Sequence, residues 1–370
     1  MTEIEIGRSK RARTGYGFDD ISIVPSRRTR DSDLVSLQWQ IDAFKFDTPV
    51  LGAPTDSVMS PATVIALGRA GGLGVLNLEG VWTRYDDPEP LLAEIAGLPA
   101  DLATNRMREI YAEPIKPELI RDRLAQIRDA GVVVSGSLSP QAVQEHYETV
   151  LAAGVELMVI RGATVSAEHV SAEQGSPLNL KQFIYELDVP VVVGGVVTYT
   201  AALHLMRTGA AGVLVGFGGG AASTSERVLG VAAPMATAVS DVAAARRDYL
   251  DESGGRYVHV IADGSIGSSG DIAKAIACGA DAVMIGSPLA RATEAPGRGF
   301  HWGSEATHAD LPRGERVEFA PVGSLEEIMF GPSRVADGTM NLVGALRRAM
   351  ATTGYTELKE FQRIEVVVQS

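Results

Sequence analysis

The sequence predicts a (β/α)8 TIM barrel of the α/β class. Eight short runs rich in Val, Ile and Leu recur along the chain, and most precede a small-residue turn and an amphipathic stretch. Nearly every position in these runs is apolar, which is typical of strands buried on both faces of a parallel sheet. Eight strand–helix repeats fit a barrel of about 250 residues with additions. A doubly wound open sheet is the alternative arrangement of the same elements.

The elements follow one another in a regular order. Several predicted helices begin after Ser, Thr or Asp and end near a Gly, which is the usual asymmetry of helix caps. The predicted strands are residues 49–53, 72–76, 132–135, 155–160, 189–193, 212–215, 258–262 and 282–285. The predicted helices include residues 61–70, 117–129, 140–153, 199–208 and 271–277, with 337–353 as a closing helix and 362–369 as a strand-like tail.

Two additions accompany the barrel. Residues 1–48 form a polar N-terminal arm that contains the basic cluster Arg27, Arg28 and Arg30. Residues 296–336, after the eighth strand, show no clear period, and so long an excursion on this face of a barrel would cover the active site in the manner of a flap. Because the chain has no domain-scale linker, we expect residues 1–370 to form a single domain.

Composition excludes several classes of protein. The 33 basic and 46 acidic side chains give a net charge of −13, so a nucleic acid or an anionic membrane would meet net repulsion. The single Cys cannot form a disulfide within the chain. No apolar run approaches the roughly 18 residues of a membrane helix, and the N-terminus lacks the apolar block of a signal peptide. We therefore expect a cytoplasmic protein.

The loops after strands six, seven and eight are the candidate site, because a barrel builds its site from such loops. The first has four glycines within residues 216–220, which lets the backbone approach a ligand closely and direct amides at an anion. The other two contain Asp263-Gly264-Ser265 and Gly286-Ser287. Loops after strands seven and eight often bind phosphate in this fold. Asp263 is placed to accept hydrogen bonds from ribose hydroxyls; its alternative role is the N-cap of the next helix.

Several motifs in these loops and elsewhere resemble one enzyme family. They are GFGGGAASTS at 216–225, IADGSI at 261–266 with SGDIAKA at 269–275, VMIGS at 283–287, FDD at 18–20 before Val24-Pro25, APTDSV at 53–58 and TEAPG at 293–297. In this order they resemble the IMP dehydrogenase/GMP reductase family over nearly the whole chain. The resemblance is closest to the actinobacterial IMP-dehydrogenase-related branch. That branch lacks the regulatory pair of CBS domains, and residues 79–131 are too short to hold them.

The resemblance implies a purine nucleotide ligand, namely IMP, XMP or GMP. The residues that match the family's nucleotide and phosphate positions are Ala53, Gly218, Gly219, Gly220, Asp263, Gly264, Gly286 and Ser287. The phosphate-binding serine of the strand-six loop is replaced by Ala221.

The resemblance also implies catalysis by a cysteine after strand six, which attacks the purine so that hydride passes to NAD or ammonia leaves. Here Ser223 and Thr224 stand at the family's Cys-Thr position. A thiol of pKa about 8.5 supplies thiolate at neutral pH, whereas a hydroxyl needs an adjacent base. No such base is evident near Ser223 in the sequence. Cys278 falls at the opposite end of the barrel, where we expect a buried small hydrophobe. We therefore predict that NAD-dependent IMP oxidation is weak or lost.

The cofactor side departs from the family as well. Arg161 replaces the carboxylate that serves the cofactor ribose, and Gly195 replaces an asparagine. Arg161 either binds a second phosphate or carboxylate of a ligand, or pairs with Glu156 or another acid at the barrel mouth. The sequence therefore does not favour an NAD site.

Two further family features are weakened. Leu214 replaces a basic residue late in strand six. The flap that carries the family's Arg and Tyr should lie within residues 303–316, an interval that is much shorter here and contains no Tyr. Arg313 or Arg316 would fill part of that role, or would form solvated pairs with Glu315 and Glu318.

The sequence also bears on potassium binding, on the oligomeric state and on two alternative functions. The family holds K+ on carbonyls that correspond to Gly218, Gly220 and Ser223, but the tail at 357–370 lacks the expected glycine pair, so K+ is not favoured. The resemblance implies a homo-oligomer, a tetramer or octamer. The alternatives to a weakly active nucleotide-binding protein are an oxidoreductase with altered chemistry and a regulatory subunit of a family paralogue.

Overall fold

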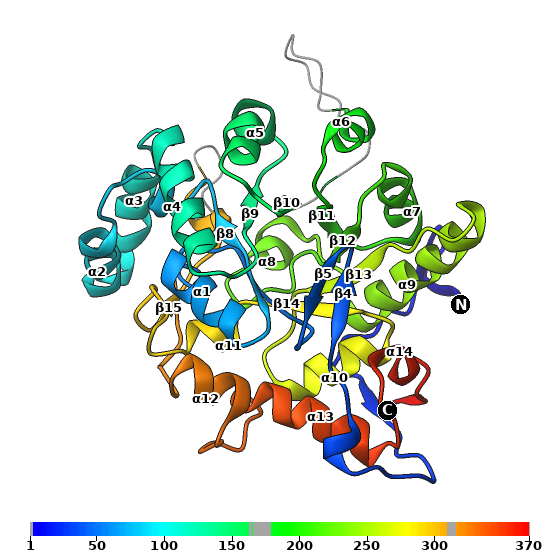
Figure 1. Cartoon of the computed structure of the whole chain (residues 1–370). Coiled ribbons are helices and arrows are strands. Elements are labelled where there is room, and N and C mark those ends of the chain that lie inside the picture. Colours follow the sequence, from blue (N-terminus) through cyan, green and yellow to red (C-terminus); the bar gives the residue numbers. More distant parts are fainter. Residues whose placement is uncertain (1–2, 163–164, 166–178, 309–315, 370) are drawn as a thin grey trace.

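A nearly closed barrel of parallel strands forms the centre of the protein (Figure 1). The computed structural model describes residues 3–162, 165, 179–308 and 316–369. The strands, in the order in which they pair, are β7 (Leu73–Gly74), β6 (Val50–Gly52), β14 (Ala282–Ile285), β13 (His259–Asp263), β12 (Gly212–Val215), β11 (Val191–Val196), β10 (Leu157–Arg161), β9 (Ser135–Leu138) and β8 (Leu76–Asn77). The two ends of this sheet, β7 and β8, are halves of one strand position separated only by Val75. This arrangement confirms the (β/α)8 barrel, and the doubly wound alternative is wrong.

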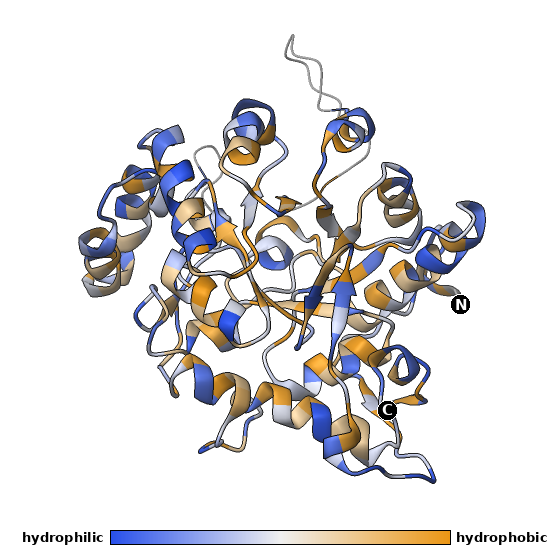
Figure 2. Ribbon diagram, viewed as in Figure 1, coloured by the Kyte–Doolittle hydropathy of each residue, from blue (hydrophilic) through white to orange (hydrophobic). Residues whose placement is uncertain are grey.

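Helices surround the barrel and bury one face against it. Figure 2 shows apolar residues toward the strands and polar residues outside. In α1 the buried face includes Val64 and Leu67, and the helix begins with a capping box between Ser60 and Thr63. The helices of the ring are α1 (Pro61–Arg69), α4 (Pro117–Asp129), α5 (Val143–Ala152), α6 (Leu180–Glu186), α7 (Tyr199–Arg207), α9 (Met235–Glu252), α10 (Ser269–Ala277) and α13 (Leu342–Thr352).

Most predicted elements have the expected positions, with differences at their edges. The third strand begins at Ser135, where the prediction has it end, because its segment Ser135–Leu138 is less apolar than the run before it. The closing helix begins at Leu342 rather than at residue 337. The tail forms α14 (Leu358–Phe361) and the strand β17 (Val366–Val368), which pairs with β3 (Ile21–Ile23).

The N-terminal arm closes the amino-terminal end of the barrel. It forms β1 (Glu3–Gly7), β2 (Lys10–Arg13), β3, η1 (Ser32–Leu34), β4 (Trp39–Ile41) and β5 (Phe44–Phe46). Although predicted as polar, the arm buries Trp39 and Ile41. Trp39 stacks on Phe46 with ring centroids 5.2 Å apart and meets His259, the first residue of β13, edge-on at 5.8 Å. The ligand-accessible end of the barrel is therefore the opposite one.

A buried cluster of charges also lies at this amino-terminal end. Asp281, directly before β14, accepts hydrogen bonds from Arg246 at 2.7 Å, Val260 N at 2.8 Å and Lys359 at 2.9 Å. Burial alone would raise the pKa of Asp281, but Arg246 and Lys359 outweigh it and hold this pKa well below its usual range. The cluster connects α9 and α14 to the base of the sheet.

A helical hairpin is inserted between β8 and α4 and packs on the excursion. It follows η2 (Val81–Thr83) and consists of α2 (Glu89–Gly97) and α3 (Ala100–Tyr111). The short helix α11 (Ser287–Ala290) follows β14 directly. The excursion contains β15 (Phe300–His301), η3 (Ser304–Ala306), β16 (Val317–Glu318) and α12 (Leu325–Phe330) among its described residues.

Arg316 joins the excursion to this hairpin. Its guanidinium lies 4.0 Å from the Phe300 ring centroid and donates to backbone carbonyls of the hairpin, including that of Ala96 at 2.8 Å. The prediction that Arg316 pairs with glutamates in solvent is therefore wrong, because the side chain points inward; Arg313 lies outside the described residues. Among the described residues, no helix is long and apolar enough to cross a membrane.

Candidate functional site

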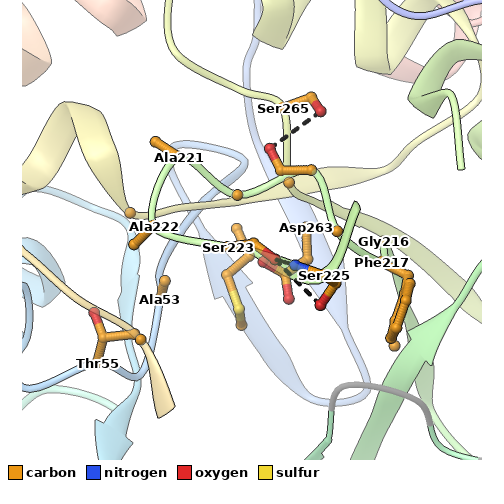
Figure 3. A pocket seen from close by; sticks show the side chains of 18 of the residues that line it. Ala53, Thr55, Gly216, Phe217, Ala221, Ala222, Ser223, Ser225, Asp263 and Ser265 are labelled. Atoms are coloured by element: carbon orange, nitrogen blue, oxygen red, sulfur yellow. Dashed lines mark hydrogen bonds between the residues drawn. The ribbon is translucent and has the colours of Figure 1, made fainter. Parts of the chain in front are cut away.

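A pocket lies at the carboxyl-terminal ends of the barrel strands and brings the predicted site residues together. Figure 3 shows the loop after β12 curving around it from Gly216 to Ser225, with Asp263 in the same view. Thr224 lies between two residues of the lining, Ser223 and Ser225. The predicted residues that line the pocket are Ala53, Arg161, Gly195, Gly218, Gly219, Gly220, Ser223, Asp263, Gly264, Gly286 and Ser287.

Glycines let the loops after β12 and β13 approach each other. A Cβ atom at Gly216 would fall 1.7 Å from the carbonyl oxygen of Asp263, so no side chain fits there. Gly218 has a φ of 76°, a left-handed conformation that favours glycine. The carbonyl of Gly219 accepts hydrogen bonds from the amide of Ser265 at 2.7 Å and from its hydroxyl at 3.2 Å. These contacts fix the glycine-rich loop against its neighbour.

Arg161 and Asp263 form an ion pair across the pocket. Arg161 Nε donates to Asp263 Oδ2 at 2.8 Å, and a second, longer contact joins its Nη2 to Oδ1 at 3.5 Å. The charge of Asp263 raises the pKa of Arg161 further. Of the two predicted roles for Arg161, pairing with a barrel-mouth acid is observed, but the acid is Asp263; Glu156 instead accepts a hydrogen bond from Val134 N. The N-cap of α10 is Ser268, so the N-cap alternative for Asp263 is wrong.

Glu305 of the excursion contacts the segment that replaces the family's Cys-Thr. Its carboxylate accepts hydrogen bonds from Ser223 Oγ at 2.9 Å, Thr224 N at 2.7 Å, Thr224 Oγ1 at 2.9 Å and Ser225 Oγ at 2.9 Å. The sequence shows no candidate base next to Ser223, whereas the structure places the Glu305 carboxylate there. The sequence gives no signal for this contact, because Glu305 is 82 residues from Ser223 and lies in a segment without periodicity.

This carboxylate is a weak base. Burial alone would raise the pKa of Glu305, but the hydrogen bonds from Thr224, Ser225 and Ser223 outweigh it, so the pKa is lowered. A general base works best with a pKa near the operating pH. Glu305 is thus suited to fixing the loop and poorly suited to taking a proton from Ser223. Cys278 cannot supply a thiol here, because it caps the C-terminal end of α10 at the far end of the barrel, where burial raises its pKa.

His301 is a second pocket residue that the sequence prediction missed. Its Nδ1 lies 2.9 Å from Ser57 Oγ, and the ring is buried. Burial and, second, the charge of Arg161 lower the pKa of His301 to about 4. The imidazole is therefore neutral at pH 7 in the structure.

A buried junction behind the pocket connects the excursion to the barrel. Asp56 Oδ2 accepts hydrogen bonds from Tyr111 Oη at 2.6 Å and Val81 N at 3.0 Å, and Trp302 Nε1 donates to Tyr111 Oη at 3.0 Å. Asp56 Oδ1 is buried without a hydrogen-bond partner among the described residues. Burial raises the pKa of Asp56 to about 6, although the bonds from Tyr111 and Val81 act in the opposite direction. The excursion is thereby fixed to the loop after β6, to η2 and to α3.

The described residues contain no group of three or more His, Cys, Asp or Glu side chains that could hold a metal ion. The carbonyl of Gly220, one of the oxygens considered for K+, accepts a hydrogen bond from Ser223 N at 2.8 Å.

The fold and the pocket define a TIM-barrel protein whose candidate site is formed by the loops after the sixth to eighth strands and closed by the excursion. The family model for the IMP dehydrogenase / GMP reductase domain matches residues 15–309. The chain is 52% identical to an uncharacterized oxidoreductase of Mycolicibacterium smegmatis, with 99% of this chain and 100% of the relative covered. It is 33% identical to the inosine-5'-monophosphate dehydrogenase of Thermoplasma acidophilum, with 94% and 90% covered.

A solved structure agrees with these similarities. The crystal structure of an IMP dehydrogenase/GMP reductase-like protein from Corynebacterium glutamicum superposes with a TM-score of 0.94 at 51% identity, covering 99% of this chain and 98% of that one. The chain therefore belongs to the IMP dehydrogenase/GMP reductase family, which confirms the resemblance seen in the sequence.

Proposed function

We propose that the protein binds a purine nucleotide, IMP, XMP or GMP, and has little or no NAD-dependent IMP dehydrogenase activity. The single observation that carries this proposal is the contact of Glu305 with Ser223 and its neighbours. It places a carboxylate of lowered pKa where family catalysis needs a reactive thiolate. The hydroxyl of Ser223 needs a general base to become a nucleophile, and a carboxylate of lowered pKa is a poor one.

Nucleotide binding is supported by the backbone rather than by the side chains. The loops that contain Gly218, Gly264 and Gly286 lie around one pocket, where we expect their amides to donate to phosphate oxygens. Asp263 keeps Oδ1 at 3.5 Å from Arg161, so this oxygen is the weaker side of the ion pair. It is the oxygen that we expect to accept a ribose hydroxyl.

The cofactor side fits NAD poorly. Arg161 stands where the family has the carboxylate that serves the cofactor ribose, and its guanidinium is already engaged by Asp263 at 2.8 Å. A cation in this position would repel no phosphate but would offer the ribose hydroxyls no acceptor. A homo-oligomer remains a prediction from the resemblance, and a single-domain organisation remains a prediction from the absence of a domain-scale linker.

Calorimetry with IMP, XMP and GMP, together with an assay of NADH production, tests the proposal. We expect saturable binding of at least one nucleotide, with IMP oxidation absent or far below that of a family dehydrogenase assayed in parallel. Robust NADH production from IMP would contradict it.

One observation favours a second function, an oxidoreductase with altered chemistry. Ser223 is hydrogen-bonded to a carboxylate, which is the arrangement that an activated serine requires. If this function operates, the Ser223→Ala variant will lose an activity that the unchanged protein shows. The lowered pKa of Glu305 makes this the weaker proposal.

A further inference from the structure

His301 is held with one ring nitrogen toward the barrel and the other toward the pocket. Ser57 Oγ lies 2.9 Å from Nδ1 and 3.2 Å from both the backbone nitrogen and the carbonyl oxygen of Trp302, with Thr55 Oγ1 at 3.5 Å. The Phe319 ring lies against the imidazole at 6.0 Å between centroids. These contacts fix the orientation of the ring.

The other nitrogen, Nε2, faces the loop after β14. A Cβ atom built on Gly286 would lie 3.2 Å from Nε2, and the same position is 3.7 Å from the Cβ of Ala53. Both residues line the pocket together with His301. Nε2 has no hydrogen-bond partner among the residues that the structure describes. A side-chain nitrogen in a buried ring is thus presented to the place where the strand-eight loop would hold an anion.

The charged side chains around this place do not neutralise a bound anion. The charged side chains in the described lining are Arg161 from β10, Asp263 from β13 and Glu305 from η3. Of these described side chains, Arg161 is the one cation and is paired with Asp263, while Glu305 carries a second negative charge. A phosphate dianion that entered would therefore meet a net negative set of side chains. A proton on His301 would supply the missing positive charge and a second ring donor.

We propose that His301 is a ligand-binding residue that donates a hydrogen bond from Nε2 to the phosphate of the bound nucleotide and takes up a proton as the phosphate binds. This inference rests on the proposed function, because it assigns the nucleotide phosphate to the pocket. The uncharged imidazole of the empty pocket matches this role, since burial and Arg161 disfavour the cation only until an anion arrives. Binding and protonation of His301 are then coupled.

Proton uptake is measured by titrating IMP calorimetrically near pH 7 in two buffers of different ionisation enthalpy. The phosphate is already mostly a dianion there, since its second pKa is about 6. We expect uptake that approaches one proton for IMP and none for inosine, which lacks the phosphate.

Two variants separate the role of His301 from a structural one. His301→Asn retains a polar atom near Nδ1 for Ser57 but removes Nε2, and we expect IMP to bind about tenfold to a hundredfold more weakly without proton uptake. His301→Gln places an amide near the Nε2 position and should bind with intermediate affinity, also without uptake. His204→Asn, on the exposed part of α7, is the matched control and should behave as the unchanged protein.

The outcomes are distinguishable. Binding of IMP without proton uptake, or equal uptake by His301→Gln, would overturn the role of His301 while leaving the proposed function intact. Absence of IMP binding to the unchanged protein would overturn both.

Discussion

Replacing Glu305 with alanine removes the carboxylate that joins the excursion to the loop after β12. Four groups of Ser223, Thr224 and Ser225 donate hydrogen bonds to that carboxylate at 2.7 to 2.9 Å. A hydrogen bond to a charged group contributes about 1.5–3 kcal/mol, but these four share one partly exposed acceptor, and water replaces it when it is removed. We therefore expect Glu305→Ala to lower the free energy of unfolding by about 2–4 kcal/mol, well short of the simple sum.

The Glu305→Gln variant separates shape from charge. Its amide oxygen still accepts from Thr224 N, and its amide group can donate to a rotated hydroxyl, so we expect a loss of no more than about 1 kcal/mol. Because the pKa of Glu305 is lowered in the folded state, the advantage of the carboxylate over the amide is present above a pH of about 4.5. It is lost as the pH falls through the folded pKa.

Urea unfolding measures these changes, and hydrogen exchange of the Thr224 amide reports the loop directly. Glu318→Ala, an exposed substitution elsewhere on the excursion, is the control. Glu305→Ala should exchange the Thr224 amide faster than either the unchanged protein or this control. If Glu305→Ala is as stable as Glu318→Ala and exchange at Thr224 is unchanged, the contact does not order the loop.

Three other predictions follow from the structure. In the Ser223→Cys variant, the neighbouring Glu305 carboxylate should raise the pKa of the new thiol above about 8.5. Iodoacetamide should therefore alkylate this thiol more slowly near pH 7 than the same thiol in Ser223→Cys/Glu305→Gln. Equal alkylation rates would show that the carboxylate has no influence on the thiol. Burial raises the pKa of Asp56 to about 6, so its ionisation costs stability as the pH rises from about 4 to about 6. Over that window the free energy of unfolding of the unchanged protein should fall by about 3 kcal/mol relative to that of Asp56→Asn. If urea unfolding shows the same pH dependence for both proteins, this prediction is wrong. Asp281→Ala leaves Arg246 buried without its partner at 2.7 Å and should lower the free energy of unfolding by about 3–5 kcal/mol, measured by urea unfolding. A loss below about 1 kcal/mol would mean that the charge cluster around Asp281 is dispensable for stability.

The barrel was predictable because strands buried on both faces are apolar at nearly every position. The strand Gly212–Val215 has this pattern and coincides with its prediction. The strand Ser135–Leu138 contains two Ser and a Gly, so the sequence pattern favours the more apolar run before it. The strand position around Val75 is divided into β7, which pairs with β6, and β8, which pairs with β9. This division depends on the neighbouring strands, so the local sequence does not predict it.

The pocket was predictable only where its residues lie in loops next to strands. Gly218, Asp263 and Gly286 follow three neighbouring strands, so the fold alone places them together. His301 and Glu305 come from the excursion, whose path is decided by tertiary contacts rather than by periodicity.

Electrostatic partners were harder still to foresee. Arg161 and Asp263 were each predicted at the barrel mouth, but their ion pair joins residues 102 positions apart. It depends on side-chain directions that the sequence does not encode locally.

The most direct test of nucleotide binding without dehydrogenation is one calorimetric titration of IMP into the protein with NAD present throughout. If the nucleotide binds and Ser223 cannot replace the thiol, each injection should give a heat pulse that returns to baseline, and the pulses should decline to saturation. A thermal power that stays displaced after each injection, with NADH accumulating in the cell, would show turnover and contradict the account.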